Sequence, residues 1–293
     1  MDSNLLARAD AALGDAVKLA EKLPERSLYL TEWARNATLN TDISEEERDN
    51  QLRDRTDQLR NAPSIGGSSG AKQAALLVGK SLTDKGKLTE AINQYNSVLS
   101  EYDKADPAKP LDPAKADGSD ASLLLARAFC RCFGLSDAQW NLTAAESVLK
   151  DASRVVQLKP GAHLEALADW CAASAKLRST RSNSATFTAA KKQDYLKSGV
   201  DDVKKAIEAA PNDPDSWEWR RRGAIMLGTM ISLSGASTPP DLLKTQAAEA
   251  RRWIDDAIEM AAKRPNLADK LESIQRDQQD LEKALTAKGM PRT

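Results

Sequence analysis

The chain has 293 residues, and its 42 basic and 43 acidic residues leave a formal net charge of -1 at pH 7. That balance argues against a protein built as a whole to neutralise nucleic-acid phosphates or to coat an anionic membrane. Ala, Leu and charged residues dominate, while β-branched and aromatic residues are too scattered to form runs that alternate with period two. The composition therefore predicts an all-α protein.

The N-terminal stretch MDSNLLARADAALGD carries acidic residues early and lacks the uninterrupted apolar core of a secretory signal. No later stretch approaches the apolar length that is needed to span a bilayer. Cys130, Cys132 and Cys171 are an odd number without a disulfide framework, which agrees with a reducing compartment. We therefore expect a cytoplasmic protein without membrane contact.

Helix start signals recur along the chain. Ser44 and Ser136 each open a capping box, in which the serine oxygen accepts from an early backbone N–H and the fourth residue reaches back. Asp213 and Thr238 each precede a proline, which suits the first helical position. In chain order, the expected helices span 3–23, 25–39, 44–61, 71–85, 88–102, 120–134, 137–158, 162–178, 190–210, 214–234, 239–263 and 266–287.

Three stretches rich in Pro, Gly, Ser and charge interrupt these helices and read as exposed loops or linkers, at 63–70, 106–120 and 178–186. They suggest an N-terminal helical bundle or cap, a middle part with an irregular linker near 104–119, and a C-terminal part that ends in a capping helix. The expected bounds of these three parts are 1–62, 71–178 and 187–293.

The segment 71–99 contains a helical hairpin pattern. An apolar helix with the small residue Gly79 is followed by a turn and by a second helix that carries Ala91 and Tyr95 on one face. This segment resembles the tetratricopeptide repeat (TPR), a helix-turn-helix unit of about 34 residues whose small residues let paired helices approach closely.

Two further segments are similar to the same family. The segment 147–174 places Pro160 where a repeat closes, and the segment 199–219 places Gly199 at the family's spacing from Trp217. The resemblance implies antiparallel helical hairpins, stacked into an α-solenoid. It covers about half the chain, because irregular spacers interrupt the period.

The resemblance also implies a binding groove, lined by selected positions on the first helix of each repeat. Matched residue by residue, these positions fall on Leu76, Lys80, Asp84, Ala168, Ala172, Lys176, Glu218, Arg222 and Ile225. With Trp217 as the anchor, Arg221 takes a position usually held by glycine or alanine. Anchoring on Trp219 puts Gly223 there and shifts the groove set. In neither register does the sequence reproduce the family's lysine, asparagine and arginine clamp for a peptide carboxylate.

The stretch DPDSWEWRRRG at 213–223 combines two tryptophans with three arginines. Trp217 and Trp219 point about 200 degrees apart on a helix, so they cannot form a stacked pair, and we expect at least one to be packed in the core. The arginines fan out in the same way and cannot form one concentrated patch. We expect them to pair with Asp213, Asp215 or Glu218, or Arg222 to reach an acidic or C-terminal group on a bound peptide.

No catalytic motif competes with this interpretation. Cys130 and Cys132 lie on nearly opposite helix faces, which disfavours a shared metal ion, and His163 is the only histidine. The stretch IGGSSGAKQ lacks the second glycine and the Ser or Thr of a phosphate-binding loop. The sequence therefore predicts no catalytic residue, no metal site and no cofactor.

The last expected helix carries a seam of mainly apolar residues at spacings of 4, 3, 4, 3 and 4, made of Leu267, Leu271, Ile274, Gln278, Leu281 and Leu285. The seam resembles one side of a coiled coil. One interpretation is that this helix covers the end of the repeats by packing on the preceding helix. The alternative is a homodimer contact, in which Gln278 would help to set the register.

The sequence thus favours a non-catalytic scaffold or adaptor that binds a protein or peptide partner. One alternative is a purely structural accessory subunit of an enzyme. The other is a regulatory nucleic-acid-binding protein, which the near-neutral charge disfavours. Its contacts would come from Lys191, Lys192, Lys204, Lys205, Arg220, Arg222, Arg251 and Arg252.

Overall fold

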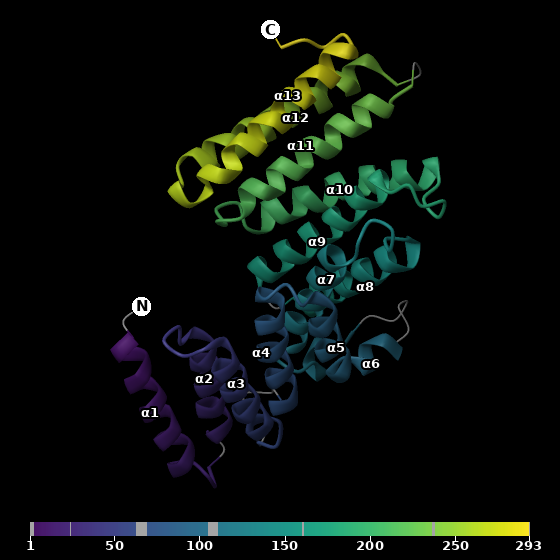
Figure 1. Ribbon diagram of the computed structural model, residues 1–293. Coiled ribbons are helices and arrows are strands. Elements are labelled where there is room, and N and C mark those ends of the chain that lie inside the picture. The colour runs from purple at the N-terminus through teal and green to yellow at the C-terminus, as the bar shows by residue number, and fades with distance from the viewer. Residues whose placement is uncertain are drawn as a thin grey trace. The chain divides into compact units, whose positions relative to one another are not determined.

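The structure is a computed structural model that describes residues 3–23, 25–62, 69–104, 111–159, 161–235 and 238–292. These residues form helices, turns and connecting segments, and no strand is found among them (Figure 1). The predicted all-α class is confirmed. Pro160 and much of the predicted loops around 63–70 and 106–120 lie outside the described residues.

The chain divides into two compact units, Met1–Gly134 and Leu135–Thr293, which we call unit 1 and unit 2. Unit 1 contains α1 (Ser3–Leu19), α2 (Arg26–Leu39), α3 (Glu45–Arg60), α4 (Gly70–Asp84), α5 (Leu88–Val98), α6 (Ser100–Lys104), the short 3-10 helix η1 (Pro113–Lys115) and α7 (Asp120–Gly134). Unit 2 contains α8 (Leu142–Leu158), α9 (Ala162–Arg181), α10 (Ala189–Ala209), α11 (Ser216–Leu233), α12 (Pro240–Ala262), η2 (Pro265–Leu267) and α13 (Ala268–Ala287).

Two of the predicted helix starts are found in the structure. Ser44 Oγ accepts a hydrogen bond from the backbone N–H of Glu47 at 3.1 Å, and α3 begins at the residue after the serine. Helix α12 has Pro240 at its first position, where a backbone N–H would have no partner inside the helix. Its cap residue is Pro239 rather than Thr238.

The other two predicted starts are wrong by a few residues. The side chain of Gln139 accepts from the backbone N–H and the hydroxyl of Ser136, at 3.0 and 2.9 Å, but these bonds close only a turn. Helix α8 begins after Asn141, whose side chain accepts from the N–H of Ala144 at 3.0 Å. Likewise, α11 begins at Ser216 instead of 214. A capping box thus shows where a turn forms, but it does not by itself fix the first residue of the helix that follows.

Helices contact one another in chain order within each unit. In unit 1, contacts join α1 to α2, α2 to α3, α3 to α4, α4 to α5 and α5 to α7, and α2 also contacts α4, which contacts α7. In unit 2, each of α8 to α12 contacts the next long helix, α9 contacts α11, and α11 contacts α13. This sequential packing is consistent with helical hairpins. It also brings alternate helices together.

The hairpin of α4 and α5 depends on a close approach at Gly79. A Cβ atom at this position would lie 2.3 Å from the ring of Tyr95, so only glycine fits beneath the ring. Burial raises the pKa of Tyr95 to about 12. The predicted helix at 88–102 is broken after Val98, where the fully buried Leu99 separates α5 from α6.

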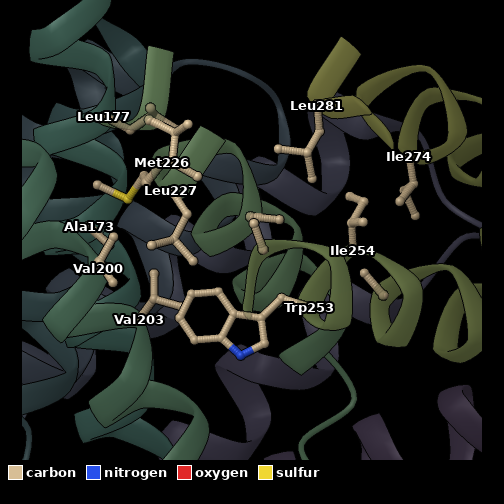
Figure 2. Packing of buried hydrophobic residues seen from close by; sticks show 14 of the residues in the cluster. Ala173, Leu177, Val200, Val203, Met226, Leu227, Trp253, Ile254, Ile274 and Leu281 are labelled. Atoms are coloured by element: carbon tan, nitrogen blue, oxygen red, sulfur yellow. The ribbon is translucent and has the colours of Figure 1, made fainter. Parts of the chain in front are cut away.

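Unit 2 has a continuous apolar core that runs from α9 to α13 (Figure 2). Three glycines let neighbouring helices approach, because a Cβ atom on each would come within 2.0 to 2.6 Å of a side chain on another helix. The glycines and the residues packed on them are Gly199 with Met226, Gly223 with Trp253, and Gly228 with Leu281.

The two tryptophans of α11 are both buried, as predicted for at least one. Trp217, 8% exposed, belongs to the same apolar cluster as Trp253. Trp219, 1% exposed, lies in a separate cluster with Ala166 of α9 and Ala206 of α10. Helix α11 is therefore apolar on two sides: α9 and α10 contribute to both clusters, and α12 and α13 only to the one that contains Trp217.

The seam predicted on the last helix faces the core of unit 2. Ile274, Leu281 and Leu285 are buried in the cluster shared with α11 and α12, and the two remaining leucines pack against it. Gln278 donates a hydrogen bond to Asp255 Oδ1 of α12 at 2.6 Å. This packing corresponds to the capping interpretation. A homodimer through the seam would require α13 to leave this position.

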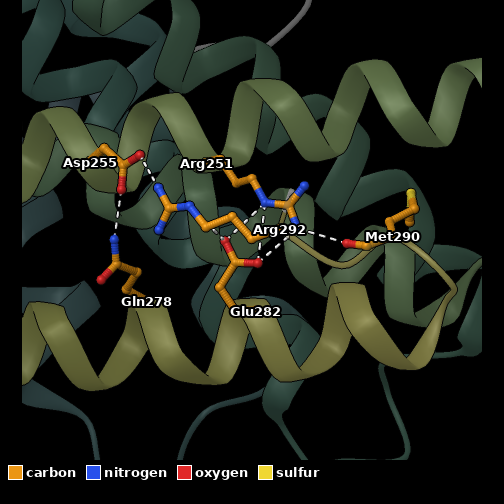
Figure 3. A network of polar contacts seen from close by, with 6 residues as sticks. All are labelled: Arg251, Asp255, Gln278, Glu282, Met290 and Arg292. Atoms are coloured by element: carbon orange, nitrogen blue, oxygen red, sulfur yellow. Dashed lines mark hydrogen bonds and ion pairs between the residues drawn. The ribbon is translucent and has the colours of Figure 1, made fainter.

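A polar network holds the residues after α13 against α12 and α13 (Figure 3). Arg251 of α12 pairs with Glu282 of α13 at 2.7 Å and donates to the carbonyl oxygen of Met290, also at 2.7 Å. Arg292 pairs with Asp255. The side chain of Met290 packs against the apolar core, so the segment that follows the last helix is tied down at both residues.

Candidate functional site

A cleft of about 400 Å³ lies in unit 1 between α2, the α2–α3 connection and the start of α3 on one side, and α4 on the other. The predicted groove residues Lys80 and Asp84 both line it, whereas Leu76 does not. The complete lining is Arg35, Thr38, Leu39, Thr41, Arg48, Asp49, Leu52, Leu77, Lys80, Ser81, Asp84 and Lys85.

Lys80 and Asp84 lie one helical turn apart on α4, which places them on the same face. Both are exposed, and neither makes an ion pair or side-chain hydrogen bond with another described residue. Leu39, Leu52 and Leu77 contribute apolar surface to the same cleft. The cleft thus offers one cation, one anion and an apolar wall.

The remaining charges of the cleft already have partners. Lys85 Nζ lies 2.5 Å from Asp49 and 3.0 Å from Glu45, so it ties the end of α4 to the start of α3. Arg48 donates to the backbone carbonyls of Asn40 and Ile43 at 3.1 and 3.3 Å. These contacts build the wall of the cleft and leave Lys80 and Asp84 available to a ligand.

The groove positions predicted on α9 are mostly occupied by packing. Ala168 and Ala172 are buried, and Lys176 is paired with Asp202 of α10 at 2.5 Å. Near them, the pKa of Asp169 is raised to about 6, chiefly by burial and then by repulsion from Asp202. These charges lie between α9 and α10. The ion pair of Lys176 and Asp202 stabilises the contact of the two helices, and the repulsion between Asp169 and Asp202 opposes it.

The groove positions predicted on α11 are engaged within unit 2. Arg222 pairs with Glu218 at 2.9 Å, and its guanidinium lies 5.3 Å from the ring centroid of Trp170 on α9. Ile225 packs against the apolar core. Helices α9 and α11 are in contact, as the predicted groove requires, but Glu218 and Arg222 pair with each other.

The other two arginines of the triplet also meet acidic residues. Arg221 binds Asp277 of α13 at 2.6 Å and Ser273 at 2.8 Å, and Arg220 lies 3.7 Å from Asp256. Of the partners predicted for the triplet, Glu218 pairs with Arg221 and Arg222, whereas Asp256, Asp277 and Ser273 were not predicted. The partners come mainly from α12 and α13, which sequence spacing did not indicate.

Most of the basic residues considered for nucleic-acid contact are likewise neutralised or occupied. Lys204 and Arg252 lie 3.1 and 3.7 Å from Glu249, and Arg251 is held by Glu282. Lys192 donates to the Ser182 carbonyl at 2.8 Å. Neutralised side chains of this kind would displace few counterions from a phosphate backbone.

A third cluster of ionisable groups joins α4 to α7. Lys72 lies 2.5 Å from the buried Asp120 and 2.8 Å from Glu101, and the Tyr102 hydroxyl donates to Asp120 at 2.5 Å. Burial alone would lower the pKa of Lys72, but its bonds to the two carboxylates raise it overall. Each ionised group has a partner within the unit, so we assign this cluster a structural role.

The cysteines and the histidine do not assemble a site among the described residues. Cys130, Cys132 and Cys171 are each buried, and burial raises the pKa of the Cys130 thiol. His163 Nδ1 lies 2.5 Å from Asp213. Within the described ranges, no three His, Cys, Asp or Glu side chains converge as a metal site would require.

A larger depression of about 640 Å³ runs along α13. It is lined by Gln278, Gln279, Glu282, Lys283, Thr286, Ala287 and Arg292. All but the last lie on one helix, and Glu282 and Arg292 take part in the network of Figure 3. The described residues that line it include no second helix, so the cleft beside α4 is the better enclosed of these two sites.

No protein-family model, curated protein or solved structure matches this chain. Among the described residues, none of the helices combines the length and the apolar character that crossing a membrane would require.

Sequence reasoning missed one whole wall of the cleft. Arg35 and Leu39 come from α2, which belongs to the segment expected to be a separate bundle or cap, and Arg48 and Lys85 shape the rim. No spacing rule connects α2 to α4 across the stretch between them. Only the packing of the structure shows that α2 contacts α4 and so completes the cleft.

Proposed function

We propose that this chain is a non-catalytic scaffold or adaptor of divergent TPR-like helical hairpins, which binds an extended peptide segment of a protein partner in the cleft between α2 and α4. The observation that carries the proposal is that Lys80 and Asp84, derived from the resemblance to the repeat family, line a cleft of about 400 Å³. They are also exposed and carry unmatched charges.

The contact pattern supports the same interpretation. If α2, α4 and α7 are the first helices of successive hairpins, the contacts of α2 with α4 and of α4 with α7 are those expected between stacked repeats. In unit 2, α9, α11 and α13 have the corresponding contacts. First helices packed side by side present one common face, and extended peptides bind such faces in repeat proteins.

The cleft chemistry indicates what kind of peptide would fit. An acidic side chain can meet Lys80, a basic side chain or an N-terminal amine can meet Asp84, and an apolar side chain can cover Leu39 and Leu77. Because the two charges lie one helical turn apart, a peptide that satisfies both must carry opposite charges a few residues apart. The unit 2 positions contribute less, since Lys176, Glu218 and Arg222 are paired within the chain.

The test is a selection of random peptides on the immobilised full chain, followed by affinity measurements on variants. We expect Lys80→Glu and Asp84→Lys each to weaken binding of a selected peptide by about tenfold, which corresponds to about 1.4 kcal/mol. Lys104→Glu is the matched control, because Lys104 is exposed in the same unit and does not line the cleft.

Two results would reject the proposal. One is that no peptide is selected by the wild-type chain at any practical concentration. The other is that the peptide binds the two cleft variants and the Lys104→Glu control equally well while all three remain folded by circular dichroism.

A further inference from the structure

Helix α1 carries a stripe of apolar residues that the described residues of unit 1 leave largely exposed. Leu5, Ala9, Ala12, Ala16 and Leu19 follow spacings of 4, 3, 4 and 3, so they lie within an arc of roughly 80 degrees. Leu19 is 84% exposed and Leu5 57%, the first two alanines are exposed, and Ala16 is half-buried.

The orientation of α1 is fixed by its other apolar face. Leu6, Val17 and Ala20 are buried, and α1 packs on α2. Asp10 of α1 pairs with Arg55 of α3 at 2.7 Å and accepts from Asn36 of α2 at 3.1 Å. With that face anchored, the stripe from Leu5 to Leu19 lies beside it, about 90 degrees around the helix, and most of the stripe stays exposed.

Large exposed apolar side chains concentrate in this part of the molecule. Among the described residues, five of the ten large hydrophobic residues that are exposed lie between positions 5 and 29, namely Leu5, Leu19, Leu23, Leu28 and Tyr29. Single exposed leucines are common, but a concentration of them indicates an interaction surface.

We propose that the stripe from Leu5 to Leu19 binds a second copy of the same chain through antiparallel pairing of the two α1 helices. A repeat of 3.5 residues keeps a stripe facing a partner helix, and alanines at its centre allow the two axes to come close. An antiparallel pair of identical helices is two-fold symmetric, so each contact is formed twice.

Charge complementarity selects the second copy as the occupant and sets the register. Arg8 and Asp15 flank the stripe on the same side. When Ala9 lies opposite Ala12 of the second copy, Arg8 faces Asp15 of the second copy, and the reverse contact forms as well. A shift by one heptad would instead bring the two Asp15 side chains together, which is unfavourable.

Both charges are available for such pairing. Arg8 is exposed and makes no ion pair with another described residue. Asp15 lies 3.5 Å from Lys18, but both side chains are more than 70% exposed. Exposed pairs of this kind contribute little to stability, so Asp15 can exchange Lys18 for an arginine of the second copy.

The experiment measures the mass of the full chain by sedimentation equilibrium over a range of concentrations. We expect a reversible dimer for the wild-type chain and a monomer for Ala12→Glu, which places two charges at the centre of the contact. Arg8→Glu should weaken dimerisation about tenfold or more, and Arg8→Glu with Asp15→Arg should restore it, because exchanging both charges recreates the pairs.

Leu233→Glu is the control, since Leu233 is exposed at the end of α11 in the other unit and should leave dimerisation unchanged. Thermal melting checks that each variant is folded, and the restored double variant excludes general damage. A wild-type chain that stays monomeric at every concentration would overturn the proposal and leave the stripe to another protein. A dimer that is unaffected by Ala12→Glu would also overturn it, and would point back to α13.

Discussion

Units 1 and 2 are built from the same kind of helices but differ in how their side chains are packed. Unit 2 has one apolar cluster that runs from α9 to α13 and includes the buried Trp253. The apolar clusters described in unit 1 are smaller. Both units bury some charged residues: in unit 1 the side chain of Arg55 is almost fully buried and pairs with Asp10, and Arg127 is fully buried and pairs with Asp103, while Asp151 and Arg154 are buried in unit 2.

This difference suggests that unit 2 provides more of the folding stability and that unit 1 provides the binding surfaces. Buried apolar area is the main source of folding free energy, and unit 2 has the larger continuous core. Unit 1 instead holds the cleft beside α4 and the exposed apolar stripe on α1. We therefore expect core substitutions to be most costly in unit 2, and binding to depend on unit 1.

The largest expected effect is that of Trp253→Ala. The ring packs over Gly223 and against Val203, and its removal leaves a cavity in the largest core, so we expect a loss of about 3–5 kcal/mol in the free energy of unfolding. Trp33→Ala in unit 1 should cost roughly half as much or less, because Trp33 is only half-buried. Guanidinium unfolding followed by circular dichroism measures both. Equal costs would contradict the comparison.

Adding a methyl group at Gly79 tests the close approach of α4 and α5 in unit 1. The Cβ atom of Gly79→Ala would meet the Tyr95 ring at 2.3 Å, so α4 and α5 must separate, at a cost of about 1–3 kcal/mol. Gly235→Ala is the matched control, because nothing lies within 4 Å of its Cβ position, and it should change stability by less than about 0.5 kcal/mol. A neutral Gly79→Ala would show that this hairpin packs more loosely than described.

The charges between α9 and α10 predict a pH dependence that is confined to unit 2. The pKa of Asp169 is raised from 3.8 to about 6 in the folded chain, so its ionised form opposes folding above about pH 6. That cost disappears as the pH falls towards 3.8. Asp169→Asn should therefore raise stability by about 1 kcal/mol at pH 8, after allowance for partial exposure, and give little gain near pH 4.

Asp194→Asn serves as the control, since Asp194 is exposed on the same helix pair. Urea unfolding at the two pH values gives the comparison directly. A gain of the same size at pH 4 and pH 8 would show that ionisation of Asp169 is not its cause.

The smallest effect compares two serines that look equivalent in sequence. Ser44→Ala removes a helix cap and should cost about 1 kcal/mol, while Ser136→Ala removes a bond within a turn and should cost less than about 0.5 kcal/mol. Thermal unfolding of the two variants under identical conditions measures the difference. If Ser136→Ala proved the more damaging, the turn before α8 would have a larger role than its contacts indicate.

Local patterns predicted much of this fold because they depend on neighbouring residues. The helical class, most helix positions, the close hairpin at Gly79 and the burial of at least one of Trp217 and Trp219 follow from periodicity, small residues and bulky aromatics. The start of α8 was wrong because a capping box closes a turn whether or not a helix continues from it.

The candidate site was harder to predict, because it depends on contacts between distant segments. Lys80 and Asp84 could be named from the repeat resemblance, but the opposing wall at Arg35 and Leu39 comes from another helix pair. The partners of the arginine triplet show the same limit. Sequence spacing predicted that Arg221 would be paired, yet Asp277 is far along the chain.

Hydrogen exchange of the full chain with and without a selected peptide tests the central claim most directly. The account predicts that the peptide slows exchange in α2 and α4, on both walls of the cleft, with little change in α9 to α13. Protection confined to unit 2, with none in α2 or α4, would contradict it and place recognition on the other unit.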